Sequence, residues 1–362
     1  MIILSIVLLI AVLGLIIFVH ELGHFVMAKL FGIRVDEFGM GFPPRAWKLF
    51  SYRGTDYTLN WIPFGGFVKI YGEDSLPEND PDYHRSMVAK PWWQQIIVLV
   101  AGVTMNVMLA WIIFSGMFFI GTPSVVGPGM VTKGPAELTV LQVGESTPAA
   151  RDGIVAGDVI KKVSYDQGIL VQPTPESFTS FVQAVPENTP LTIDIVRKGN
   201  SLSLHTAPVA GIIPDKVALG VSLNMVAETE GLPFFTSLAQ GWHLTIATLK
   251  DTAHGFGQLI TGEIGVDHVS GPIGLTKIIG SAEQIGAHAV WMLIAMISLN
   301  LALINILPFP ALDGGRVLFV LIETISRRKL PPSFVFWVNT GAFILLIGLM
   351  ILISIKDVIH LF

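Results

Sequence analysis

The sequence predicts a polytopic α-helical membrane protein with four transmembrane helices, a re-entrant β-hairpin region and an inserted extracytoplasmic α+β domain. Of its 362 residues, 52% are hydrophobic and 14% are charged, and the mean hydropathy is +0.65. An ordinary soluble domain has about 25% charged residues. This composition excludes a disordered chain and argues against a wholly soluble enzyme. The net charge of −5, without a basic run, gives no nucleic-acid footprint.

Four apolar stretches are long enough to cross a hydrocarbon core of ~30 Å. They run from about Met1 to Phe31, Trp93 to Ile120, Ala287 to Leu312 and Phe334 to Ile355. The first opens with 19 residues that carry no charge. A cleaved signal peptide, the alternative for this stretch, would need a basic start and a small-residue cleavage site, and both are lacking.

Lysine and arginine predict the orientation of these spans. Residues 29–90 contain eight of them, and the connection after the third span contains four more. The roughly 170 residues between the second and third spans contain nine. The positive-inside rule then places the first and third connections in the cytoplasm. We expect the middle segment and both termini to be extracytoplasmic.

The chain is therefore predicted to contain four parts. Residues 1–121 form the first membrane part, including a β segment at 39–72, and residues 122–228 form the extracytoplasmic domain. Residues 229–286 connect it to the second membrane part, 287–362. In the domain, alternation over Leu191–Arg197 and over 201–206, around a Lys-Gly-Asn turn, predicts a β-hairpin.

The connecting segment has a distinct pattern. Residues 232–262 interleave apolar and polar side chains, which predicts an amphipathic helix pair or a surface-lying segment. A turn is expected at Ser270–Gly274, before the third span.

The strongest chemical signal is His20-Glu21-Leu22-Gly23-His24, inside the first span. Histidines at i and i+4 share one helix face, so both can bind one zinc ion, with Glu21 as general base. Glu21 lies about 12 Å along the helix from Lys29, where an ionised group costs a few kcal/mol. A polar cluster that joins helices is the alternative. Cysteine is absent, which excludes thiolate ligands.

A catalytic zinc usually has three protein ligands, and Asp313 is the best candidate for the third. It lies at the cytoplasmic end of the third span, after Pro308 and Pro310 and before Gly314-Gly315. Prolines and glycines break the helix there, and unwound backbone at membrane depth must be buried or line a wet cavity. A helix N-cap is the alternative role for Asp313. The remaining histidines are not assigned to the metal: His84, His205, His243, His254, His268, His288 and His360.

Two further features suggest substrate contacts. Asn300 and Asn305 are expected to be buried amides that face one region, where they bond either a neighbouring helix or a substrate backbone. Arg53–Lys69 alternates and contains Gly65-Gly66, which predicts strands folded back toward the membrane. Their open edge could pair with an unwound substrate, and an interfacial anchor is the alternative.

Together these motifs resemble the site-2 protease family of intramembrane zinc metalloproteases, in its bacterial regulator-of-sigma-E protease branch. The resemblance implies one zinc ion on His20, His24 and Asp313, with Glu21 activating water. It implies substrate handling by four residues of the third span: Asn300, Asn305, Pro308 and Pro310. Residues 144–160 resemble the PDZ pattern of bacterial membrane proteases.

The sequence departs from that family in two places. There is room for one PDZ domain where well-studied members have two. The Gly-Pro-x-x-Asn pattern of the second span is here Gly102-Val103-Thr104-Met105-Asn106, without the proline.

The resemblance implies hydrolysis of single-span proteins in a bacterial inner membrane, such as trimmed anti-sigma factors or remnant signal peptides. Membrane lipid and a peptide C-terminus at the PDZ domain are the other expected partners. A catalytically inactive scaffold that presents the PDZ domain is the main alternative, and a metal transporter is another.

Overall fold

The computed structural model describes residues 2–73, 76–77, 79–125, 132–144, 146–213, 216–263 and 271–359. The chain divides into two compact units. The first contains Met1–Phe114, Leu238–Lys277 and Leu293–Phe362. The second contains Ser115–Ser237 and Ile278–Met292.

Four helices of the described chain are long and apolar enough to cross a membrane, as predicted. They are α1 (Ile2–Leu30), α2 (Trp92–Ile120), α7 (Ala287–Ile306) and α9 (Pro332–Ile359). The third predicted span is wrong at its end, because α7 stops at Ile306 instead of continuing to Leu312. Pro308 cannot donate a helical hydrogen bond and disfavours helical backbone in the residue before it. The chain resumes as α8 (Asp313–Ser326).

The connecting segment forms a single helix, so the expected helix pair is wrong. This helix, α5 (Phe234–Thr261), is 28 residues long. The turn expected at 270–274 is also wrong: Ser270 lies outside the described residues, and α6 (Pro272–Ile285) begins within that range. Proline is favourable at a first helical position. The backbone N–H groups of Gly271 and Gly274 each donate to Asp357 Oδ2 at 2.9 Å.

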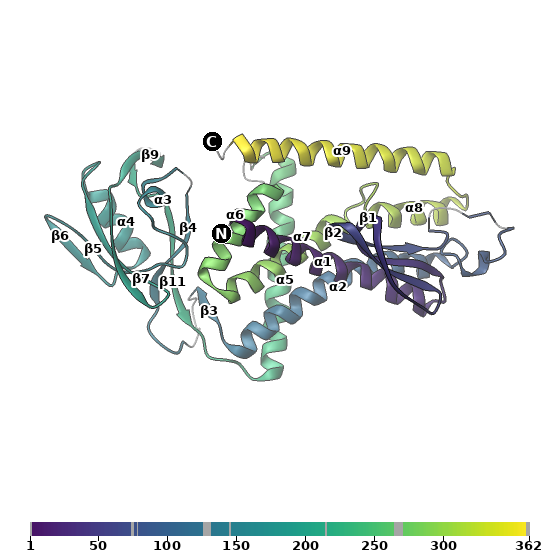
Figure 1. Cartoon of the computed structure of the whole chain (residues 1–362), viewed down its shortest axis with the longest axis horizontal. Helices are drawn as coiled ribbons and strands as arrows, with labels where there is room; N and C mark the ends of the chain where they lie inside the picture. Colours follow the sequence, from purple (N-terminus) through teal and green to yellow (C-terminus); the bar gives the residue numbers. More distant parts are fainter. Residues whose placement is uncertain are drawn as a thin grey trace. The chain divides into compact units, whose positions relative to one another are not determined.

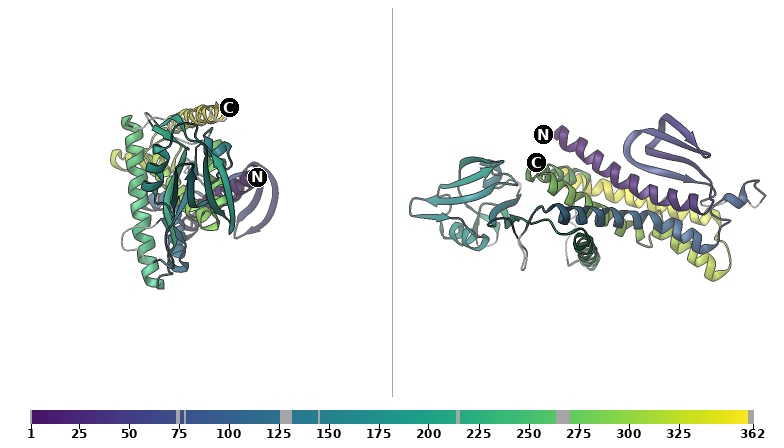
Figure 2. Two further views of the ribbon diagram at one scale, coloured as in Figure 1. Left: turned by 90° about the vertical axis from the view of Figure 1, so that its left-hand side faces the viewer. Right: turned by 90° about the horizontal axis from the view of Figure 1, so that it is seen from below.

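The predicted strands between the first two spans are present as β1 (Val35–Tyr52) and β2 (Thr55–Ile70), joined by a two-residue turn. Both strands bend, so the pair forms four arms. Residues 35–40 pair on one side with 66–70 and on the other with 56–59, and residues 45–52 pair with 55–60. Figure 2 shows this sheet beside α1, and the backbone of Gly66 lies close to side chains of α1.

The second unit contains an antiparallel sheet in the order β3-β11-β4-β5-β7-β8, with β6 paired to β5 (Figure 1). The strands are β3 (Pro123–Val125), β4 (Glu137–Val143), β5 (Val159–Tyr165), β6 (Gly168–Val171), β7 (Leu191–Arg197), β8 (Asn200–Thr206) and β11 (Val221–Glu228). A smaller pair is formed by β9 (Val209–Ile213) and β10 (Lys216–Ala218). The predicted hairpin is confirmed as β7 and β8.

Two helices complete this α+β unit: α3 (Pro148–Arg151) and α4 (Pro175–Ala184). The core includes Phe178 of α4 and the inward-facing residues of β4, β5 and β7. Asp158 is fully buried and accepts a hydrogen bond from the backbone N–H of Val155. Arg197 also binds both of its carboxylate oxygens at 2.7 Å. This ion pair, in which the carboxylate is buried and the arginine is partly exposed, fixes the turn before β5 to β7.

Candidate active site

The structure brings together three side chains that can hold one metal ion. His20 and His24 lie one turn apart on α1, and Asp313 is the first residue of α8. His20 Nε2 lies 3.2 Å from His24 Nε2, and Asp313 Oδ2 lies 3.1 and 3.5 Å from these two nitrogens. Among the residues that the structure describes, this is the one group of three or more potential ligands.

These distances fit zinc. Two ligand atoms bound tetrahedrally at 2.0–2.1 Å lie about 3.3 Å apart, and the three observed separations lie on either side of that value. Two imidazoles and a carboxylate are also a donor set of catalytic zinc, with the fourth position left open. The Nδ1 of His24 lies 2.8 Å from the carbonyl oxygen of Val98. If Nδ1–H donates there, Nε2 keeps its lone pair for the metal.

Glycine on both helices allows this arrangement. A Cβ on Gly102 of α2 would lie 2.4 Å from His24 Nε2 and 2.8 Å from His20 Nε2. A Cβ on Gly23 of α1 would lie 2.4 Å from the carbonyl oxygen of Ala101. Both distances are too short for a side chain at these positions. The two helices can therefore pack this closely beside the histidines only because both residues are glycine. Gly102 entered the sequence prediction only as the first residue of the pattern that ends at Asn106, and this steric role was not predicted.

Asp313 is positioned by the break between α7 and α8. A Cβ on Gly314 would lie 2.3 Å from the carbonyl oxygens of Ile306 and Leu307, so this close turn requires glycine. Leu312, not Asp313, is the N-cap of α8. The backbone N–H of Ala311 donates to Asn339 Oδ1 of α9 at 3.1 Å, which holds the loop from the other side.

Glu21 lies beside residues 66–70 of β2, the arm that forms one edge of the β1–β2 sheet. The backbone of Val68, on the same strand, lies close to the carboxylate of Glu21. A Cβ on Gly66 would lie 3.7 Å from Glu21 Cγ, so the strand passes next to the proposed general base. Gly65, with a φ of 84°, shapes the strand there. Both glycines therefore lie near the site, as their assignment to substrate contacts requires.

The two asparagines of α7 differ. The Nδ2 atom of Asn305 lies 3.4 Å from His20 Nε2, next to the metal group. Asn300 is exposed, so the expectation that both amides are buried and face one region is wrong. Five residues separate them, which rotates their side chains about 140° apart around the helix. Pro308 is exposed and Pro310 is half-buried in the loop after α7.

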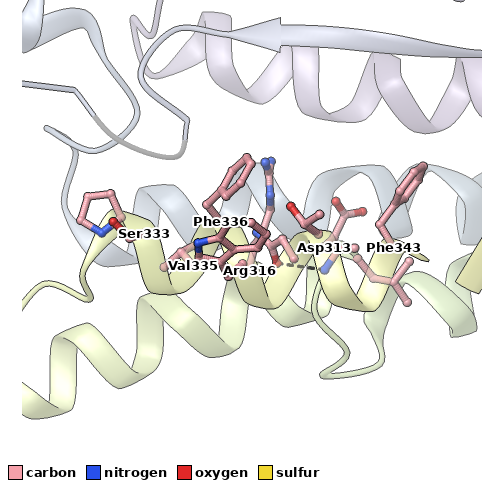
Figure 3. Close-up of a pocket in the computed structure, with 12 residues that line it drawn as sticks. Asp313, Arg316, Ser333, Val335, Phe336 and Phe343 are labelled. Atoms are coloured by element: carbon pink, nitrogen blue, oxygen red, sulfur yellow. Dashed lines mark hydrogen bonds between the residues drawn. The ribbon is translucent and has the colours of Figure 1, made fainter. Parts of the chain in front are cut away.

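A cavity of about 850 Å³ opens beside Asp313, between the start of α8 and α9 (Figure 3). Its walls include Arg316, Trp337, Asn339 and Phe343. Arg316 forms an ion pair with Glu73, which follows β2.

Two of the histidines that were not assigned to the metal, His268 and His360, lie outside the described residues.

A helix of membrane length that carries two histidines and a glutamate, next to a carboxylate that completes a possible zinc group, is typical of a membrane metalloprotease. Residues 8–349 match peptidase family M50, and the chain belongs to this family, the site-2 proteases. A zinc metalloprotease, by name, of Clostridium perfringens is 36% identical over 346 residues, 95% of each chain. One of Nostoc is 33% identical over 360 residues, covering 97% of this chain and 95% of its own. The regulator of sigma-W protease RasP of Bacillus subtilis is 26% identical over 438 residues, 98% of each chain.

Proposed function

We propose that this chain is an intramembrane zinc endopeptidase that hydrolyses peptide bonds within or near the transmembrane segment of single-span proteins. The observation that carries the proposal is the group of His20, His24 and Asp313 on a helix of membrane length and the adjoining loop. Hydrolysis of a soluble protein would not require zinc ligands that lie on a helix of membrane length.

The residues have distinct roles in the proposed reaction. When held by the two histidines and Asp313, one zinc ion supplies Lewis-acid activation of water and of the scissile carbonyl. Glu21 accepts the proton of the attacking water and returns it to the leaving amine nitrogen. Asn305, whose amide lies beside His20, donates a hydrogen bond to the substrate backbone.

A helical substrate hides its backbone, so it must become extended before hydrolysis. The arm at 66–70 pairs with 35–40 on one side, and the described residues provide no strand for its other side. An extended substrate can add to such an edge through backbone hydrogen bonds. Because Gly66 lies against Glu21, a strand added here would pass close to the general base. Pro308 and Pro310, in the loop after α7, are proposed to line the substrate path.

The second unit supports a role in peptide binding. β4 pairs with β11 along 221–226, whereas β3 covers β11 only from 226 to 228. Among the described residues no further strand pairs with that edge of β11, and Val221, Ser222 and Leu223 line a cavity of about 410 Å³ together with Phe178 and Val182 of α4. We propose that residues 122–228 form a PDZ domain whose groove takes a peptide C-terminus by strand addition.

The charge pattern supports the proposed location. Lysine and arginine concentrate in the first and third connections, which we place in the cytoplasm of a bacterium. The PDZ domain and both termini would then lie outside the inner membrane. The sigma-regulating relative supports pre-cleaved anti-sigma factors as one substrate class, with remnant signal peptides as another.

The test is cleavage of a single-span reporter by the purified, zinc-loaded chain and by Glu21→Gln, with the cut bond mapped by mass spectrometry. We expect a cut within or near the reporter's transmembrane segment, and a loss of activity in Glu21→Gln with zinc retained. Equal cleavage by both proteins would refute the proposal. Binding of the reporter without any cleavage would support the scaffold instead.

A further inference from the structure

We propose that Asn106 is a positioning residue that accepts a hydrogen bond from His20 Nδ1 and thereby directs the Nε2 lone pair of His20 at the metal. The inference rests on the proposed zinc site. It concerns a side chain of α2 that binds neither metal nor substrate.

One face of α2 serves both histidines. Val98, Gly102 and Asn106 follow one another at intervals of four residues, so they share a helix face. Val98 O lies 2.8 Å from His24 Nδ1, and Asn106 Nδ2 lies 3.3 Å from His20 Nδ1. Gly102, between them, leaves room for both rings. Each ligand histidine therefore turns Nε2 toward Asp313 and Nδ1 toward α2.

Metal binding sets the direction of the hydrogen bond to Asn106. A neutral imidazole that uses Nε2 as a ligand carries its proton on Nδ1, which is then a donor. A donor cannot bond the amide nitrogen of Asn106, which is also a donor. The other end of the same amide, Oδ1, is buried and has no hydrogen-bond partner among the described residues. Rotating the amide by 180° exchanges O and N, and gives both the Nδ1–H group and Oδ1 a partner.

The backbone of Asn106 is held independently. Ser298 of α7 donates a hydrogen bond from Oγ to the carbonyl oxygen of Asn106 at 2.9 Å. Asn106 is fully buried, so water does not reach its amide from the surface. Partners of the second ring nitrogen typically change metal affinity about 10–100-fold when removed.

The experiment measures zinc affinity of the full chain in detergent by competition with a chelator. Asn106→Leu keeps the branching at Cγ, with a larger side chain, and removes the acceptor, whereas Asn106→Asp keeps an acceptor oxygen. Ser298→Ala is the matched control, because it removes a buried hydrogen bond at the same residue without touching His20. The absorption spectrum of the cobalt-substituted protein provides a second readout of ligand geometry.

We expect Asn106→Leu to bind zinc roughly 10–100-fold more weakly, with an altered cobalt spectrum. Asn106→Asp should stay within a few-fold of the unchanged protein, and Ser298→Ala should match it. Asn106→Ala is the second acceptor-free variant if leucine disturbs folding. Unchanged affinity in both acceptor-free variants, or equal losses in Asn106→Asp and Asn106→Leu, would overturn the inference. A failure of the unchanged protein to bind zinc would instead refute the proposed function.

Discussion

Gly102 provides a direct steric test of the metal site. In Gly102→Ala the new methyl carbon would lie 2.4 Å from His24 Nε2, whereas ordinary contacts begin near 3.4 Å. The rings or α2 must therefore move by about 1 Å, while zinc sites tolerate deviations of about 0.2 Å. Misplacement by about 1 Å can cost a factor of about 100 in rate. We expect a loss of zinc affinity and of peptidase activity of at least this size.

The assay compares zinc content, chelator competition and reporter cleavage for Gly102→Ala and Gly116→Ala. Gly116 lies on the same helix, and a Cβ there would meet no atom within 4 Å. Both substitutions add one methyl group and raise helix propensity equally, so a difference between them reports the space beside the histidines. Zinc affinity in Gly102→Ala equal to that of the control would refute the steric argument.

Three further outcomes follow from the structure. Gly66→Val should narrow the space beside the general base, because its Cβ would lie 3.7 Å from Glu21 Cγ and would carry two further methyl groups. We expect a lower kcat in the reporter assay while zinc content stays unchanged. Asp158→Ala should remove the acceptor of the hydrogen bonds from Arg197 and from the backbone N–H of Val155 and cost about 1.5–3 kcal/mol, read as faster hydrogen exchange in β5 and β7. The hydrogen bond that Tyr71 donates to Asp80 raises the pKa of the phenol to about 12. The stabilising contribution of this hydrogen bond should persist at pH 10 and be lost above 12, and Tyr71→Phe should remove a phenol that ionises near pH 12 from an ultraviolet titration.

Local periodicity explains what the sequence predicts well. His20 and His24 are four residues apart on a continuous helix, so their proximity follows from helix geometry alone. The four spans follow from hydropathy in the same way. Asp313 is separated from His20 by 293 residues. Asp313 could still be predicted as a ligand, because few ionisable residues occur in apolar surroundings at that end of the third span.

Features that depend on the neighbouring helix were not predictable. Which face of α7 is buried depends on its packing, and this is why Asn305 lies near the site and Asn300 is exposed. The need for Gly102 depends on rings contributed by α1. The four-armed sheet depends on a bend within β1, near Gly41, whose φ is 82°. Strand alternation indicates a strand but does not show where it bends.

The most direct test of the central claim is X-ray absorption at the zinc edge of the purified chain, compared with Asp313→Ala. We expect one zinc per chain, with two imidazole nitrogens at about 2.0–2.1 Å and a carboxylate oxygen at about 2.0–2.2 Å. Removing the carboxylate should weaken binding and eliminate that oxygen contribution. A first coordination shell without two imidazoles, or a spectrum and affinity unchanged by Asp313→Ala, would contradict the proposed His20, His24 and Asp313 centre.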